Sequence, residues 1–167
     1  MKLARSALLA LAAVPIVSIA SGAADQPISA TGRWHLDFAR SSTPGGRHPN
    51  SVTLDIVTDD ERTYEATETI VENDGKMRIE HSKAEYDDNP YPVEGSPYQI
   101  TISMSRLANG SKYIKLDTAL GFRAATLCSL SNDFNVMTCD TDFTDPQGRI
   151  TPARSVYVRD TPGQPSR

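Results

Sequence analysis

The sequence has 167 residues, with 17 Lys and Arg against 21 Asp and Glu and only 2 Cys. This length predicts one domain, and the composition excludes collagen-like and coiled-coil proteins. The formal net charge of −4 leaves no excess of basic residues, so neither nucleic acid nor an anionic membrane is expected as a partner.

The first segment resembles a secretory signal. Lys2 and Arg5 precede an apolar run over residues 7–20 that ends in small residues, and this run is too short to span a bilayer comfortably. We expect cleavage after Ala23, or alternatively after Ala20, which places the mature protein in the bacterial periplasm or outside the cell. The predicted organisation is a signal peptide over 1–23, one domain over 24–159 without a membrane span, and a disordered tail over 160–167.

Alternating apolar and polar residues predict half-buried strands over residues 32–38, 52–56 and 64–71. In the third strand we expect Tyr64, Ala66 and Glu68 to point inward. The segment 73–76 then signals a hairpin. If Asp74 and Gly75 are its two turn residues, Glu68 lies opposite His81, and Lys83 shares the inward face of the fourth strand.

Three prolines between residues 87 and 97 predict a long, stiff loop without regular strand pairing. The next strand alternates from Tyr98 to Arg106 with its apolar residues facing inward. A reversal at Asn109-Gly110 follows, for which the pattern favours an odd loop with Gly110 in a bulge and Met104 opposite Leu116. Another turn at 145–148 leads into a last strand over 155–158.

Cys128 and Cys139 are predicted to form a disulfide. The turn over residues 132–135 lies midway between them, which puts them opposite each other across an antiparallel hairpin. An oxidising compartment favours such a bridge over a metal site or a catalytic thiol.

About nine short strands with regular turns and no sustained helical periodicity predict an all-β, antiparallel, up-and-down meander. Closure into a barrel buries one face of every strand and removes the exposed edges. A β-sandwich is the alternative.

The chain resembles small exported bacterial domains described as lipocalin-like, mostly of unassigned function. The resemblance spans nearly the whole mature chain and implies a barrel in which an arginine near the last strand, Arg154 or Arg159, covers Trp34; it does not imply a particular ligand. It is carried by Gly32-x-Trp34, Trp34-x-Leu36-Asp37 with Ser41, Asp74-Gly75-Lys76, Tyr86-Asp87, Tyr91-Pro92-Val93-x-Gly95-Ser96-Pro97, and Gln147-Gly148 with Val156-Tyr157-x-Arg159.

Ionisable residues are expected to gather at the barrel mouth. On the register above, Glu68 orients His81 as a general base, Lys83 is the substitute base, and Tyr64 or Tyr98 is the acid. The candidate binding residues are Arg106, Tyr98 and Tyr91 at the mouth and Trp34, Ile79, Ile102, Met104 and Leu116 on the wall. No phosphate loop, dinucleotide fingerprint or metal-ligand spacing is present, so no cofactor and no metal are predicted.

Three functions remain open at this stage. The leading hypothesis is a monomeric barrel that binds a small apolar or aromatic molecule in its interior. The second is a cofactor-independent lyase or isomerase that acts on a hydrophobic aromatic substrate. The third is a structural barrel filled by its own side chains.

Overall fold

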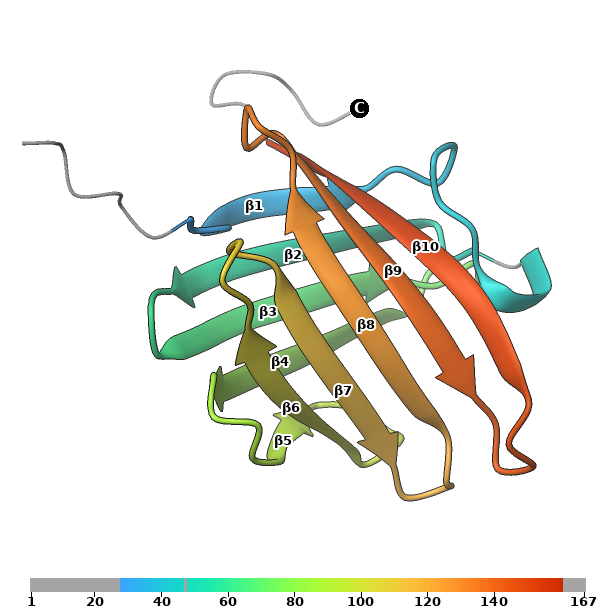
Figure 1. Ribbon diagram of the computed structural model, residues 1–167. Helices are drawn as coiled ribbons and strands as arrows, with labels where there is room; N and C mark the ends of the chain where they lie inside the picture. The colour runs from blue at the N-terminus through green and yellow to red at the C-terminus, as the bar shows by residue number, and fades with distance from the viewer. Residues whose placement is uncertain (1–27, 47, 161–167) are drawn as a thin grey trace, which may run out of the picture.

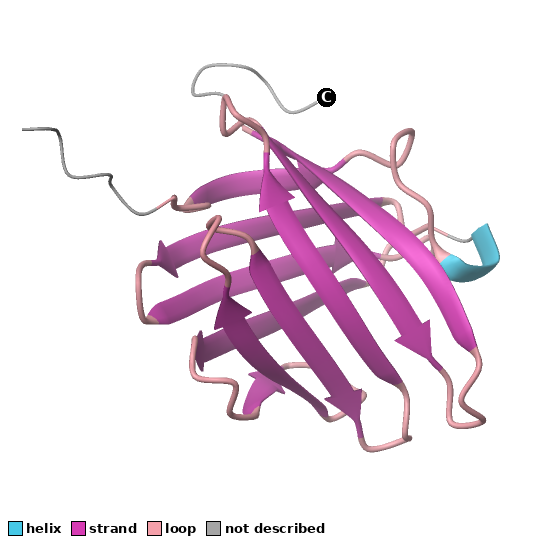
Figure 2. Cartoon of the chain, in the orientation of Figure 1, coloured by secondary structure: helices cyan, strands magenta, loops and turns pink. Residues whose placement is uncertain are grey.

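A computed structural model describes residues 28–46 and 48–160, and the predicted signal peptide and residues 161–167 lie outside this range. The described chain forms a closed antiparallel barrel of ten strands with one 3-10 turn, η1 (Pro44–Gly46), and no α-helix (Figures 1 and 2). The strands are β1 (Gly32–Leu36), β2 (Ser51–Asp59), β3 (Thr63–Val71), β4 (Met77–Glu85), β5 (Tyr91–Glu94), β6 (Ile100–Arg106), β7 (Lys112–Thr118), β8 (Arg123–Leu130), β9 (Val136–Thr144) and β10 (Ile150–Arg159).

The prediction of a closed meander is confirmed. Each strand pairs with its sequence neighbours, and β1 closes the barrel by pairing with β10, so the structure is a barrel and not a sandwich. In Figure 1, β1 to β4 form the far wall and β6 to β10 the near wall.

The tenth strand is β5, which lies inside the predicted proline-rich loop. β5 makes only two residue pairs with β4 and two with β6. Its Pro92 lacks an N–H donor, which is tolerated in such a short and sparsely bonded strand.

The predicted register of the β3–β4 hairpin is wrong by one residue. Val71 pairs with Met77, and the Glu72 N–H donates to the Lys76 carbonyl at 2.8 Å, which leaves three loop residues instead of two. A two-residue type I′ turn needs positive φ at both central residues, but only Gly75, at φ 80°, has it. Since a one-residue slip exchanges the faces of a strand, the odd-numbered residues of β4 point outward.

The other two hairpins keep the predicted faces. β6 and β7 are joined through an odd loop with Gly110 at φ 79°, although Met104 pairs with Ile114 instead of Leu116. Cys128 pairs with Cys139 as predicted, and the two form a disulfide. Both cysteines are buried on the inward face.

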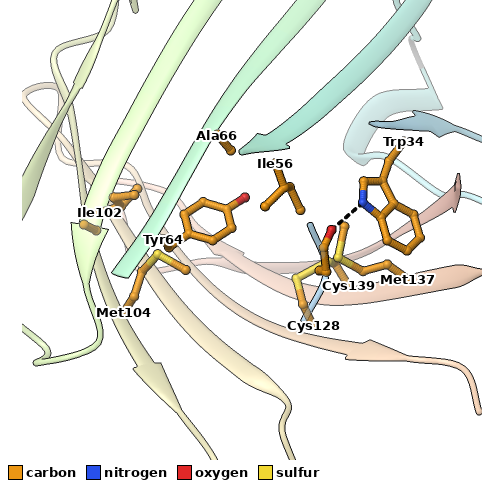
Figure 3. Packing of buried hydrophobic residues seen from close by; sticks show 11 residues of the cluster. Trp34, Ile56, Tyr64, Ala66, Ile102, Met104, Cys128, Met137 and Cys139 are labelled. Carbon is orange, nitrogen blue, oxygen red and sulfur yellow. Dashed lines mark hydrogen bonds between the residues drawn. A yellow bond between two sulfur atoms is a disulfide. The ribbon is translucent and has the colours of Figure 1, made fainter. Parts of the chain in front are cut away.

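One end of the barrel is sealed around Trp34, which is completely buried (Figure 3). Its indole Nε1 donates to the Ala30 carbonyl at 2.8 Å. The guanidinium of Arg159, and not that of Arg154, lies 4.2 Å from the centre of the Trp34 ring. A Cβ at Gly32 would stand 2.8 Å from Arg159 Nη1, so the glycine of the G-x-W motif leaves room for this arginine.

Candidate functional site

The barrel interior contains a cavity of about 310 Å³. Phe143, which lines it, is 40 % exposed, so the cavity reaches the surface near the β9–β10 turn, at the end opposite Trp34. Most of the wall is apolar, and the lining comprises Leu54, Tyr64, Ala66, Glu68, Ser82, Ile102, Met104, Lys112, Ile114, Leu116, Thr126, Cys128, Met137, Cys139, Thr141, Phe143, Ser155 and Tyr157.

Glu68 is the acidic group of this lining. The hydroxyl of Tyr157 on β10 donates to Glu68 Oε1 at 3.3 Å, across the barrel from β3. Burial in the barrel and the neighbouring Glu80 carboxylate raise the pKa of Glu68 to about 7. Burial and the charge of Glu68 also raise the pKa of Tyr157, so the phenol keeps its proton and can donate it in a hydrogen bond.

Glu80 lies directly opposite Glu68 on β4 and is also buried. Its carboxylate is 3.4 Å from Arg78 Nε, and the same guanidinium lies 3.6 Å from Glu72. Among the described residues, no Lys, Arg or His forms an ion pair with Glu68. Two carboxylates therefore stand side by side on the inner wall with one cation, Arg78, which pairs with Glu80 and Glu72.

A second polar cluster closes the barrel at the Trp34 end. The fully buried Asp59 carboxylate accepts from the Ala30 N–H at 2.5 Å and the Tyr86 hydroxyl at 2.6 Å, and pairs with Lys112 at 2.8 Å and with Arg106. Arg106 also donates to the backbone carbonyls of Ile28 and Asp60. These contacts tie β2, β6, β7 and the N-terminal segment together.

This buried cluster places one carboxylate, Asp59, between two cations, Lys112 and Arg106. Burial by itself would raise the pKa of Asp59, but Lys112 and the hydrogen-bond donors hold it below its usual value. Burial likewise lowers the pKa of Lys112, and Asp59 opposes that shift. The Lys112 ammonium, although it borders the cavity, is therefore already engaged.

Several residues predicted to form the site do face the cavity. Tyr64, Glu68, Ile102, Met104 and Leu116 all line it. Figure 3 shows Tyr64 and Met104 in the buried cluster that extends toward Trp34. Trp34 itself and Arg106 belong to the sealed end instead of the cavity wall.

The predicted pairing of Glu68 with His81 is wrong. The slip in the β3–β4 register puts Thr67 opposite His81 and Glu65 opposite Lys83. His81 Nε2 and Lys83 Nζ lie 3.7 and 3.1 Å from Glu65 on the outer face. The four residues of the predicted catalytic group are thus divided, with Glu68 and Tyr64 inside the barrel and His81 and Lys83 outside.

Three further binding candidates also lie away from the cavity. Ile79 is on the outer face of β4 and 53 % exposed, because the same slip turned it outward. Tyr98 is exposed, with the Arg78 guanidinium 5.7 Å from its ring centre. The Tyr91 hydroxyl donates to Asp87 at 3.0 Å on the outside of the barrel.

Sequence reasoning missed Tyr157 and Glu80 as partners of Glu68. Tyr157 alternates with buried Val156 in the last strand, and its face depends on where β10 begins, which is five residues earlier than predicted. Glu80 was placed outside by the same slip that placed His81 inside. The signal that could have corrected the faces of β4 is Gly75, since a glycine at the third loop position is typical of a three-residue hairpin loop.

Comparison with protein-family models finds no family that matches this chain, and comparison with curated proteins finds no matching relative. Among the described residues, no helix has the length and apolar character needed to cross a membrane.

Proposed function

We propose that this protein binds a small, largely apolar molecule inside its barrel. The observation that carries the proposal is the interior cavity of about 310 Å³, which lies at the lower end of the roughly 300 to 1,000 Å³ range of ligand pockets. A mostly apolar wall with a few polar groups is the usual composition of such pockets. A barrel filled by its own side chains would leave no such space.

The polar groups of the wall are suited to fix the orientation of a ligand. Glu68 and Tyr157 meet on one part of the wall, whereas apolar side chains such as Ile102, Met104 and Leu116 form much of the rest. A molecule with one polar end therefore fits with its apolar part against these side chains and its polar group at Glu68.

The proposal includes a lipocalin-like, monomeric protein exported to the periplasm or beyond. It is supported by the signal-like first 23 residues, by the Cys128–Cys139 disulfide, which persists in oxidising compartments, and by Arg159 stacked on Trp34. Cell fractionation tests the location, and recovery of the protein with the cytoplasm would contradict export.

Binding has stronger support than the lyase or isomerase alternative. That mechanism depended on a Glu68–His81 pair, and the two side chains lie on opposite faces of the barrel wall. On the outside, His81 Nε2 lies 3.7 Å from Glu65, and its Nδ1 lies 3.2 Å from the Thr67 hydroxyl.

The test combines native mass spectrometry of the protein purified from the periplasm with titration of a neutral hydrophobic dye, N-phenyl-1-naphthylamine. Ser155→Phe places a large side chain into the cavity, since Ser155 lines it. The matched control is Ser51→Phe, which makes the same replacement at an exposed position of β2. We expect a bound mass or dye uptake in the wild type and in Ser51→Phe, and its loss in Ser155→Phe.

His81→Ala is a second control, because His81 is outside the barrel. Equal dye uptake by the wild type and by Ser155→Phe would place binding elsewhere. The absence of both a bound mass and dye uptake in the wild type would overturn the proposed function.

A further inference from the structure

We propose that the cavity selects apolar amines, with the ligand ammonium group held by Glu68 and its apolar part against the apolar wall of the cavity. This inference rests on the proposed binding function and names the ligand class for the same site.

The charge distribution of the inner wall carries the argument. Glu68 and Glu80 are paired residues of β3 and β4 and face the same side, while Arg78 divides its contacts between Glu80 and Glu72. Glu68 has a single hydrogen bond in the described structure, from Tyr157. A second cation is therefore the group that this part of the wall lacks, since two neighbouring carboxylates disfavour each other's ionised form and a cation beside them opposes this repulsion.

The wall around Glu68 also suits an ammonium group sterically and electronically. The Tyr157 hydroxyl occupies one carboxylate oxygen and leaves the other for a ligand donor. Tyr64, Tyr157 and Phe143 contribute aromatic rings to the same cavity, and aromatic rings attract cations through their faces.

Lys112, the cation of the lining, does not favour an anionic ligand in the same way. Its Nζ lies 2.8 Å from Asp59, and its side chain is only 5 % exposed. An anion would have to compete with Asp59 for Lys112 and would meet the carboxylate of Glu68 on the way in.

The proposed site predicts tighter amine binding as pH rises. Glu68 has a pKa of about 7, while an alkylammonium group stays charged to about pH 10. The groups that act on Glu68 are Glu80 and Arg78 from β4, Tyr157 from β10, and Tyr64 from its own strand. If only ionised Glu68 binds the amine, affinity increases about tenfold between pH 6 and pH 8.

The experiment compares three probes of equal chain length: octylamine, 1-octanol and octanoate. Their dissociation constants are measured by displacement of N-phenyl-1-naphthylamine and by calorimetry at pH 6, 7 and 8. We expect octylamine to bind most tightly at pH 8 and octanoate most weakly. Octanol, which carries no charge, should show no dependence on pH.

Glu68→Gln removes the charge with little change of shape. We expect it to weaken octylamine binding at pH 8 by about tenfold or more and to abolish its pH dependence, while octanol binding is unchanged. Glu65→Gln is the matched control, because Glu65 lies three residues away on the same strand and pairs with Lys83 outside the barrel. It should bind all three probes like the wild type.

Each outcome separates the ligand class from the proposed function. Octanol or octanoate binding as tightly as octylamine at pH 8, or equal octylamine binding by Glu68→Gln and the wild type, would overturn selectivity for amines while leaving interior binding intact. Dye uptake without octylamine binding has the same meaning. Failure of the dye and of all three probes to bind would overturn both proposals.

Discussion

Asp59 is the residue on which the sealed end of the barrel depends. Its side chain is fully buried and holds Lys112, Arg106, Tyr86 and the Ala30 N–H in one cluster. A buried ion pair contributes little compared with an apolar replacement of both partners, but removal of one partner leaves the other charge buried and uncompensated. Asp59 is thus more important to stability than any exposed acid of the chain.

Asp59→Asn should destabilise the protein by about 3 to 5 kcal/mol, because Lys112 then remains buried without a carboxylate. Urea unfolding at pH 7 measures the change. Asp88→Asn is the control, since it removes the partner of Lys115 in an exposed pair and should have little effect. A small effect of Asp59→Asn would mean that water enters the site and solvates Lys112 and Arg106.

At the scale of elements, strand identities and faces were largely predictable, whereas one register was not. Alternation in β3, β6 and β8 placed Tyr64, Met104 and Cys128 inside, as observed. The β3–β4 hairpin failed because two-residue and three-residue loops differ by a single position, and β4 carries polar residues on both faces. Met77 and Ile79, the apolar residues next to the turn, favoured the slip that exchanged His81 with Glu80, yet both are exposed on the outer face.

β5 depends on close backbone approach at Gly95, the residue that follows it. A Cβ at Gly95, where φ is 80°, would stand 2.2 Å from the Ile79 carbonyl oxygen of β4. Gly95→Ala should therefore destabilise the protein by about 2 kcal/mol or more and increase hydrogen exchange in β5. Gly148→Ala has the same backbone strain at φ 82° but meets no atom within 4 Å.

The comparison of these two variants by thermal unfolding isolates the steric contact from the backbone strain. Gly148→Ala should lose only about 1 kcal/mol, the usual penalty of the left-handed conformation. Equal losses for both variants would show that β4 and β5 separate easily to make room. In that case β5 would be a loosely attached part of the wall.

The whole barrel should be most stable in mildly acidic solution, because two of its buried acids, Asp59 and Glu68, have pKa values shifted in opposite directions. The pKa of Asp59 is lowered in the folded state, so its contribution is present above its ordinary value of 3.8 and is lost as pH falls through the folded value. The pKa of Glu68 is raised from 4.5 to about 7, so its contribution is present below 4.5 and is lost as pH rises through 7. These two groups place the maximum at about pH 4 to 5.

Glu68→Gln should remove the loss of stability on the alkaline side. A neutral amide resembles the protonated carboxyl, so we expect the variant to match the wild type at pH 4 and to exceed it at pH 8 by on the order of 1 to 3 kcal/mol. Urea unfolding at pH 4, 6 and 8 measures the difference, with Glu65→Gln on the outer face as the control. A stability difference that is the same at all three pH values would show that Glu68 ionises freely into the cavity. A difference that grows with pH would show that the fold retains an acid in its interior at the expense of stability, as a site for a positively charged ligand requires.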